Sequence, residues 1–321
     1  IINVMARLRV LVFLGAYQGA PFIAQQIRSI LQQSVNCDLV VSDDGSCDGS
    51  RAVIQEIART CPSITLINGP SHGFCATFLS MFKLPDVDRY DYVAWSDQDD
   101  LWEPDHLARA IVALESCQTP AAFGSRTRLI DRSGRGIGYS PIWRRSLSFQ
   151  NALVQSVAGG NTLVMNRSCI RWIQQCMASQ KGVSEGWVSH DWAVYLMLTL
   201  AGFPLIWDAR PTVHYRQHST NVIGSNKSLL ARVNRAKRLR DGIFAQWIQY
   251  HLLPLRQVTD AMLPSSRESL QGLMDATSTC GLASFRALVR SGVYRQGLLD
   301  QRALQGAAFL GFLTARSPKT S

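Results

Sequence analysis

The first 100 residues alternate short apolar runs with segments of helical periodicity, and this alternation constrains the fold more strongly than any other feature of the chain. Arg9–Ala16 is a mostly apolar run that is typical of a buried strand. After Pro21, a residue favoured in a first helical turn, apolar residues recur at helical spacing. Further strands are expected at Asp38–Ser42, Ile64–Ile67 and Tyr92–Trp95, with helices at Ser50–Ala58 and Phe74–Phe82.

Strands that alternate with helices predict a doubly wound, parallel α/β sheet. Beyond residue 120 the pattern is less regular. Strands are expected there at Ala121–Ile130, Leu163–Met165, Leu205–Trp207 and Thr212–Tyr215, and a helix at Asp191–Leu200. From about residue 227 the strand signals end, and Arg and Lys alternate with Leu, Val and Ile, which predicts helices. We therefore expect an α/β domain over residues 8–225 and a basic, helical C-terminal region over residues 226–321.

The positive charge of the chain is concentrated in that C-terminal region. Residues 1–226 carry 19 Lys and Arg against 18 Asp and Glu, whereas residues 227–321 carry 14 against 5. Basic residues between Arg232 and Arg240 alternate with apolar ones, as in a basic helix that lies on an anionic membrane surface. The alternative is a solvated helical face packed on the α/β domain or on a second subunit. No nucleic-acid-binding module is recognisable, so nucleic acid is not an expected partner.

Cysteine usage and hydropathy indicate a cytoplasmic protein. The eight cysteines form no C-x-x-C pair and no cluster with zinc spacing, which favours reduced, buried thiols. No apolar run reaches the roughly 20 residues of a membrane span, and no secretory leader is evident. We expect the protein to be cytoplasmic, with a peripheral position at the inner face of the cytoplasmic membrane as the alternative that the basic region allows.

Polar and acidic clusters follow the first, second and fourth expected strands. Open α/β sheets bind their ligands at the carboxyl ends of the strands, so these clusters are expected to share one site. Neither a G-x-G-x-x-G motif after the first strand nor a G-x-x-x-x-G-K-[ST] motif is present. The usual dinucleotide and P-loop phosphate cradles are therefore excluded.

The strongest chemical signal is Ser96-Asp97-Gln98-Asp99-Asp100, directly after an apolar strand. Three carboxylates within four residues repel one another, an arrangement that a bound cation makes tolerable. A hard divalent ion held by one or two carboxylates typically takes its remaining ligands from substrate phosphates and water. The alternative is an acidic, solvated turn whose Asp side chains cap the next helix.

Four other polar segments are candidates for the same site. Asp43 and Asp44, before Gly45, can accept hydrogen bonds from a base or a ribose, or can simply form a strand-to-helix turn. Asp191, after His190, can act as a general base or cap a helix. The polar segment with Arg216 and His218 suits a diphosphate or a metal, or is a basic surface loop, and the glycine pair 159–160 permits close backbone approach or a turn.

In their order along the chain, these features resemble the inverting glycosyltransferases of family 2 with the GT-A fold, and most of all the bacterial rhamnosyltransferases. The resemblance covers about residues 8–225. It rests on Ala16-Tyr17, DDGSCDGS at 43–50, Gly73-Phe74, SDQDDLW at 96–102, AGGN at 158–161, HDW at 190–192 and YRQHSTNVIG at 215–224. The resemblance implies a GT-A-type doubly wound sheet with a helical basic C-terminal extension. It also implies a donor that is a nucleoside-diphosphate sugar, with dTDP-L-rhamnose as the suggested example.

The resemblance also implies roles for single residues. Asp191 is the implied general base, and Asp97 and Asp99 form a DxD-type pair in which Asp99 binds Mg²⁺ or Mn²⁺ directly. The remaining residues implied in donor binding are Ala16, Tyr17, Asp43 and Asp44 for the base and ribose, Gly160 for the sugar, and Arg216 and His218 for the diphosphate or the metal. The implied reaction is a single in-line displacement, with Asp191 removing the proton of the acceptor hydroxyl.

Three departures from patterns of the wider family are present. Many relatives have Glu-Asp where this chain has His190-Asp191, so the implied base is retained in an altered surrounding. Cys47 stands where Thr or Ser is common. Arg171-Trp172 lacks the Gln of the Q-x-x-R-W motif of processive members, which disfavours a polymerase.

The implied acceptor is a hydroxyl of a growing surface polysaccharide or lipid-linked glycan. Two alternatives differ in class. A nucleotidyltransferase usually has a basic, Gly-rich loop after the first strand, and LGAYQGAPF has no Lys or Arg. A non-catalytic protein that binds a nucleotide sugar or a membrane surface during polysaccharide assembly needs no general base, so the set of Asp97, Asp99 and Asp191 argues against it.

Overall fold

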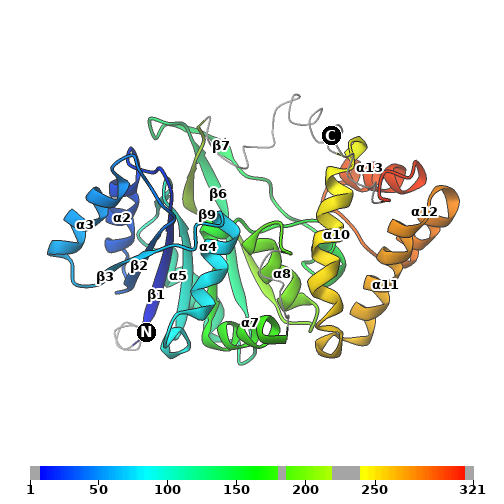
Figure 1. The fold of residues 1–321 in the computed structure, drawn as a ribbon, viewed down its shortest axis with the longest axis horizontal. Coiled ribbons are helices and arrows are strands. Elements are labelled where there is room, and N and C mark those ends of the chain that lie inside the picture. Colours follow the sequence, from blue (N-terminus) through cyan, green and yellow to red (C-terminus); the bar gives the residue numbers. More distant parts are fainter. Residues whose placement is uncertain (1–7, 180–185, 219–238, 315–321) are drawn as a thin grey trace.

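The computed structural model describes residues 8–179, 186–218 and 239–314. A central β-sheet has helices on both faces, and a group of helices packs at one end of it, on the right of Figure 1. The α/β class and the helical C-terminal region that the sequence predicts are both present.

The sheet has the strand order β3-β2-β1-β4-β8-β6-β9-β5, and β7 pairs with β6. The strands are β1 (Val10–Ala16), β2 (Asp38–Asp43), β3 (Ile64–Asn68), β4 (Tyr92–Asp97), β5 (Leu101–Trp102), β6 (Ala122–Ile130), β7 (Gly136–Tyr139), β8 (Val164–Asn166) and β9 (Leu205–Arg216).

The half of the sheet built from β3, β2, β1 and β4 is parallel, as expected. The other half is mixed, because β8 is antiparallel to both β4 and β6, while β9 is parallel to β6. β9 is a single strand, whereas the sequence predicted two short ones at 205–207 and 212–215. The register with β6 shifts between Ser125 and Thr127. This local irregularity allows β9 to continue through the polar residues that separate the two predicted strands.

Alternation along β1 explains how one strand contributes to two cores. Val12 and Leu14 face a cluster formed with α2 (Ile23–Leu31), α3 (Ser50–Thr60) and α5 (His106–Glu115). Leu11 and Phe13 face the opposite cluster, formed with α4 (Phe74–Ser80), α7 (Arg167–Ser179) and α8 (His190–Thr199). The carboxyl end of β1 is therefore held rigidly from both sides, which matters because the candidate site lies there.

The C-terminal helices continue the second core. They are α10 (Ile243–Arg256), α11 (Pro264–Ser278), α12 (Gly281–Arg290) and α13 (Leu298–Phe309), and they join the cluster that contains α8 and the short helix α6 (Phe149–Ala152). In the part of the chain that the structure describes, no strand follows β9, and no helix is long and apolar enough to cross a bilayer. Residues 232–238, with most of the predicted basic cluster, lie outside the described residues.

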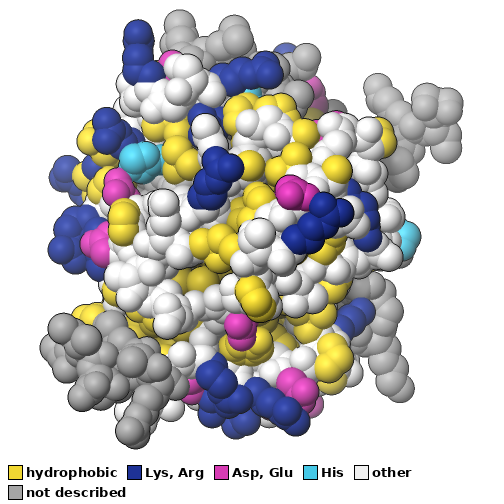
Figure 2. Space-filling view, turned by 90° about the vertical axis from the view of Figure 1, so that its left-hand side faces the viewer, with side chains coloured by type: hydrophobic (Ala, Val, Ile, Leu, Met, Phe, Trp, Pro, Cys, Tyr) yellow, Lys and Arg dark blue, Asp and Glu magenta, His cyan; other side chains and the backbone are white. Residues whose placement is uncertain are grey.

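The charge distribution seen on the surface agrees with the near balance of the N-terminal part. Figure 2 shows the end of the molecule formed by β3, α2 and α3, where Lys and Arg side chains lie in separate groups with Asp and Glu among them. This face therefore presents no continuous basic patch.

Candidate active site

Strand pairing brings the acidic segments of the sequence to one edge of the sheet. Ala16 at the end of β1 pairs with Asp43 on β2, and the preceding Gly15 pairs with Asp97 on β4. Because β1, β2 and β4 are parallel, their carboxyl ends meet, as the sequence predicts for an open α/β sheet. Two acidic loops, one after β2 and one after β4, therefore flank the end of β1.

The loop after β2 has its charge balanced by the protein. Asp43 is 3% exposed, its Oδ2 lies 3.1 Å from Nη1 of Arg51, and its Oδ1 accepts a hydrogen bond from Ser46 N at 3.1 Å. The Oδ1 and Oδ2 atoms of Asp44 accept from the backbone N–H groups of Ser71 (2.6 Å) and Gly73 (3.2 Å). Both carboxylates thus order the loops around the end of β1.

Tyr17 follows β1 and is 58% exposed, so its ring is available to a ligand at this edge. Its backbone is fixed by Gln98 from the loop after β4. Gln98 accepts from Tyr17 N at 2.8 Å and donates to Tyr17 O at 2.7 Å. This two-point amide pairing joins the segment after β1 to the acidic loop after β4, and Gln98 was not among the residues predicted from the sequence.

The loop after β4 concentrates negative charge without a balancing Lys or Arg. Burial, and then the neighbouring carboxylates of Asp99 and Asp191, raise the pKa of Asp97 to about 7. Burial, and then the carboxylates of Asp99 and Asp97, also raise the pKa of Asp100. In the described part of the chain, no Lys or Arg forms an ion pair with any of these four carboxylates.

His218 is the partner of Asp99. Its Nε2 lies 2.7 Å from Asp99 Oδ2, and both side chains are largely buried. The imidazole stacks on Phe22, with ring centroids 5.2 Å apart and an interplanar angle of 18°. The structure therefore brings His218 to the acidic loop, 119 residues away in sequence, as expected for a residue that shares its ligand.

Arg216 lies beneath that loop and is only 2% exposed. Its backbone N donates to Asp100 Oδ1 at 3.0 Å, and its guanidinium donates to the carbonyl oxygens of Asp99 (2.8 Å) and Arg132 (3.0 Å). A third donor reaches Gln25 Oε1 at 3.1 Å. This placement favours a positioning role for Arg216, and the contact with a diphosphate implied by the sequence stays a prediction.

Asp100 completes the same network. Its side chain is buried, and it also accepts a hydrogen bond from Asn161 Nδ2 in the segment before β8. Asp100, the third carboxylate of the SDQDD motif, therefore stabilises the conformation of the loop. The side chains of Asp97 and Asp99 are only partly buried and remain accessible to a ligand. Asn161 and Asp100 were not predicted as a pair, because 61 residues separate them.

Asp191 lies in the first turn of α8, where a carboxylate also interacts favourably with the helix dipole. Its Oδ2 accepts a hydrogen bond from Ser156 Oγ at 3.0 Å. The charge of Asp191 contributes to the raised pKa of Asp97, so the two carboxylates lie near each other across the site. Ser156 could not be predicted from the sequence, because it stands in a segment without a recognisable motif.

His190, which stands where the resemblance implies a Glu, is buried among aromatic rings. It stacks on Phe78 with centroids 4.1 Å apart, and it lies against Gly160, where a Cβ would come within 2.0 Å of His190 Nε2. Burial lowers the pKa of His190 to about 4, so the ring is neutral. Packing against His190 thus leaves no room for a side chain at Gly160, and the close approach of a ligand to this glycine stays a prediction.

The residues at this edge fit a divalent cation that is completed by substrate oxygens. No group of three or more His, Cys, Asp or Glu side chains within the described ranges forms a complete metal cage. Two carboxylates, Asp97 and Asp99, nevertheless lie in one loop, and burial together with the neighbouring carboxylates raises the pKa of Asp97. Hard ions such as Mg²⁺ are commonly held by one or two carboxylates together with substrate phosphates.

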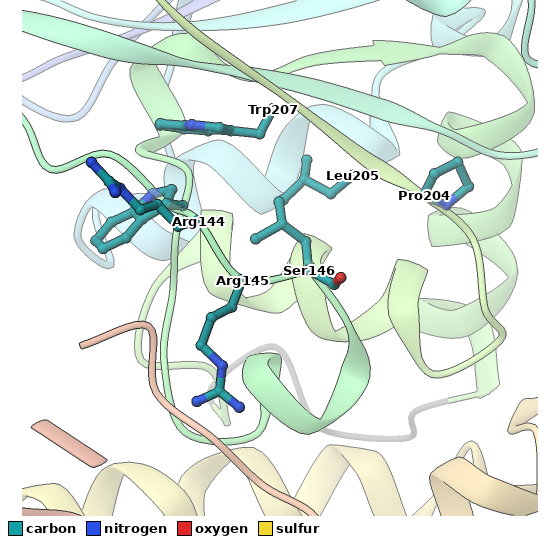
Figure 3. A pocket seen from close by; sticks show the side chains of 8 residues that line it. Arg144, Arg145, Ser146, Pro204, Leu205 and Trp207 are labelled. Carbon is teal, nitrogen blue, oxygen red and sulfur yellow. The ribbon is translucent and has the colours of Figure 1, made fainter. Parts of the chain in front are cut away.

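A separate cavity of about 320 Å³ lies beside the segment that carries Ser156. Figure 3 shows Trp207, from β9, on one side of it and Arg144 and Arg145, from the loop before α6, on the other. The Nε1 atom of Trp143, another lining residue, donates to Val157 O at 2.6 Å, which ties this wall to the residue next to Ser156. The guanidinium of Arg144 has no hydrogen-bond or ion-pair partner among the residues that the structure describes.

Comparison with known proteins agrees with this architecture. The model of glycosyl transferase family 2 matches residues 11–169. Residues 11–169 form a family 2 glycosyltransferase domain. The dTDP-rhamnosyl transferase RfbG of Shigella flexneri is 27% identical over 239 residues, which cover 71% of this chain and 79% of that protein. The chondroitin synthase of Escherichia coli is 27% identical over 138 residues, which cover 42% of this chain and 20% of that protein.

Among solved structures, TarS 1–349 of S. aureus in complex with UDP-GlcNAc has a TM-score of 0.51 and 12% identity, and the match covers 94% of this chain and 90% of that chain. At this identity the likeness shows the fold alone. Together with the family match, it confirms the GT-A-type fold. The family match and the rhamnosyltransferase-like relative support a nucleotide-sugar glycosyltransferase.

Proposed function

We propose that this protein is an inverting, metal-dependent glycosyltransferase that moves a sugar from a nucleoside diphosphate to a hydroxyl of a glycan. One observation carries the proposal: Asp97 and Asp99 from the loop after β4 and Asp191 from α8 lie at one edge of the sheet, where none of the three forms an ion pair with a Lys or Arg that the structure describes. A protein that only binds a sugar nucleotide has no need of the third carboxylate, held by Ser156 opposite the other two.

In the proposed reaction, Asp191 accepts the proton of the acceptor hydroxyl as that oxygen attacks the anomeric carbon. The bond between the anomeric carbon and the diphosphate oxygen breaks on the opposite side, so the configuration inverts. Ser156 orients the Asp191 carboxylate for this transfer. General-base assistance of this kind typically contributes about 10²–10⁴-fold to the rate.

Asp97 and Asp99 would hold Mg²⁺ or Mn²⁺, with His218 as a further candidate ligand through its position at Asp99. When bound, the ion supplies charge neutralisation for the departing nucleoside diphosphate. Arg216 and Asn161 keep the loop in the conformation that presents both carboxylates. The exposed ring of Tyr17 and the ordered loops around Asp43 and Asp44 are proposed to receive the base and ribose.

We infer that the donor is a dTDP sugar, with L-rhamnose as the leading candidate, because the relative RfbG is named a dTDP-rhamnosyl transferase and matches over 71% of this chain. The proposed division into a catalytic part at 8–225 and a C-terminal region at 226–321 follows the end of β9 and the start of the C-terminal helices.

The cavity lined by Trp143, Arg144 and Trp207 is proposed to hold a sugar unit of the acceptor. Trp207 pairs with Gly124 on β6, and Gly124 lies so close to Ala158 that an added Cβ would come within 2.8 Å of the Ala158 Cβ. The cavity therefore adjoins the segment whose Ser156 binds Asp191. Aromatic rings offer a flat apolar surface to a sugar ring, and the unpaired Arg144 suits an anionic substituent.

A transfer assay tests the proposed function. We expect dTDP-L-rhamnose to yield dTDP and an inverted glycoside in the presence of Mn²⁺, with UDP-GlcNAc and GDP-mannose as competing donors and Asp191→Asn as the inactive control. Release of nucleoside diphosphate from none of these donors, with polysaccharide or lipid-linked acceptors present, would contradict the proposal.

A further inference from the structure

The outer face of α13, the last described helix, is apolar. Its exposed residues recur at three- and four-residue spacing and therefore form one stripe, which we call the α13 stripe. The large apolar members are strongly exposed: Leu298 by 79%, Leu299 by 74%, Leu310, just past the helix, by 63% and Phe309 by 54%. The remaining exposed members of the α13 stripe are Arg302, Ala303 and Gly306.

The opposite side of the same helix is also apolar, and it is buried. Leu304, Ala307 and Ala308 belong to the main hydrophobic core. An ordinary surface helix has one apolar face against the core and one polar face in water. α13 instead exposes a second apolar face, and contiguous exposed apolar patches mark contact sites for proteins or membranes.

Arginines with unbalanced charge accompany the α13 stripe. Arg302 lies within it, and Arg286 and Arg290 lie on the exposed face of α12. None of the three forms an ion pair or a side-chain hydrogen bond with a residue that the structure describes. α12 packs against α13, and Gly311, just past α13, lies against Cys280, just before α12, so the two helices run antiparallel with the arginines beside the apolar residues.

Charge decides between the two simplest occupants of this surface. Residues 280–321 contain five Arg and one Lys against a single acidic residue, Asp300. A second copy docked about a two-fold axis would bring arginines against arginines, with almost no carboxylate to offset them. An anionic bilayer offers the opposite charge together with an apolar interior for leucine and phenylalanine side chains.

We propose that the outer face of α12 and α13 binds an anionic lipid surface, with the α13 stripe entering the boundary between headgroups and acyl chains. The inference rests on the proposed function for its purpose, since a lipid-linked acceptor lies at such a surface. In Figure 1, α13 and the edge where β6 passes into β7 both lie toward the upper side of the molecule.

This assignment differs from the one that the sequence suggests. The densest run of basic residues, between Arg232 and Arg240, falls almost wholly outside the described residues. The α13 stripe has four large apolar side chains that are exposed by more than half. Penetrating apolar side chains and surrounding cations are the two components of interfacial binding.

Sedimentation with vesicles tests the proposal on the full chain. We expect binding to mixed vesicles of phosphatidylcholine and phosphatidylglycerol, and little to phosphatidylcholine alone. Leu298→Ser combined with Leu299→Ser should weaken binding at least about tenfold, because two strongly exposed apolar anchors are lost. Replacing Arg286, Arg290 and Arg302 by Gln should weaken it by about a hundredfold, since each surface cation contributes about fivefold.

Matched controls are Leu253→Ser and Arg256→Gln, which alter exposed side chains of α10 outside the α13 stripe and should leave binding unchanged. The proposal is overturned if wild type ignores the mixed vesicles, or if the α13 and arginine variants bind them as wild type does. It is equally overturned if light scattering shows a dimer without lipid that the Leu298→Ser, Leu299→Ser variant abolishes. Nucleotide-induced thermal stabilisation, measured on every variant, reports separately on folding and on the proposed donor site.

Discussion

The two acidic loops at the carboxyl edge of the sheet look alike in sequence and differ in how their charge is handled. After β2, Asp43 is paired with Arg51, and Asp44 accepts two backbone hydrogen bonds. After β4, Asp97 and Asp99 form no ion pair with a Lys or Arg in the described part of the chain, and burial together with the carboxylates of Asp99 and Asp191 raises the pKa of Asp97 to about 7. The carboxylates of the first loop have partners within the protein, whereas we propose that those of the second are completed by a bound cation. On this proposal the first loop shapes the pocket and the second binds the metal.

The largest expected effect concerns Asp191, the third carboxylate near the loop after β4. Asp191→Asn should lower kcat by about 10²–10⁴-fold, because the amide cannot accept the proton of the acceptor hydroxyl. Nucleotide affinity should stay close to that of wild type, since Asp191 approaches the acceptor and not the base. Steady-state kinetics with parallel calorimetry measures both quantities, and an unaltered kcat would remove Asp191 from its proposed role.

The loop after β2 should respond differently. Asp44→Ala removes the acceptor of two backbone N–H groups, and we expect nucleotide affinity to fall about tenfold, equally with and without Mn²⁺, because about 1–2 kcal/mol of loop ordering is lost. Asp44→Asn keeps one acceptor oxygen and should retain part of the affinity. Isothermal calorimetry with and without metal is the measurement. A loss confined to the metal-containing samples would break the distinction between the loops.

The contribution of Asp97 to the stability of the protein should depend on pH in the opposite sense from that of an ordinary ion-paired carboxylate. The folded-state pKa of about 7 exceeds the ordinary value of 3.8, so ionisation of Asp97 opposes folding progressively as the pH rises between these values. We expect Asp97→Asn to raise the metal-free Tm at pH 8 by several degrees, at roughly 2–4 °C per kcal/mol, and to change it little at pH 4. Calorimetric scans at the two pH values decide, and a lower Tm at pH 8 would contradict the account.

The smallest expected effect concerns Ser156. Ser156→Ala removes the one side-chain hydrogen bond to Asp191 Oδ2, and kcat should fall by roughly tenfold or less while the KM for the donor is unchanged. Ser156→Thr keeps the hydroxyl and should restore most of the rate. Comparison of kcat and KM for the two variants distinguishes an orienting hydrogen bond from a general packing defect, which both variants would share.

Local sequence patterns were enough to predict the parallel half of the sheet and the acidic strand ends. Apolar runs followed by Asp-rich turns are properties of a few adjacent residues, and they located Asp43, Asp44, Asp97 and Asp99. The mixed half was less predictable, because the single strand β9 depends on its pairing with β6, and the antiparallel β8 depends on two neighbours distant in sequence.

Side-chain partners across the sheet could not be predicted from one sequence. Gln98 binds the backbone of Tyr17, and Asn161 binds Asp100, over separations of 81 and 61 residues. Arg216 is predicted to bind a phosphate because it stands near His218, and that prediction could not include the hydrogen bonds from its guanidinium to the carbonyl oxygens of Asp99 and Arg132. A motif shows which residue types are present, whereas the fold determines which partners their side chains contact.

The central claim is that the loop after β4 binds a metal together with a nucleoside diphosphate. The most direct test is thermal stabilisation by dTDP, UDP and GDP with and without Mn²⁺, on wild type, Asp99→Asn and the exposed control Asp260→Asn. A ligand at 100 times its Kd stabilises the native state by about 2.7 kcal/mol. We expect one nucleotide to raise the Tm of wild type and of the control only when Mn²⁺ is present, and Asp99→Asn to abolish that rise. Stabilisation that persists in Asp99→Asn, or that needs no metal, would contradict the claim.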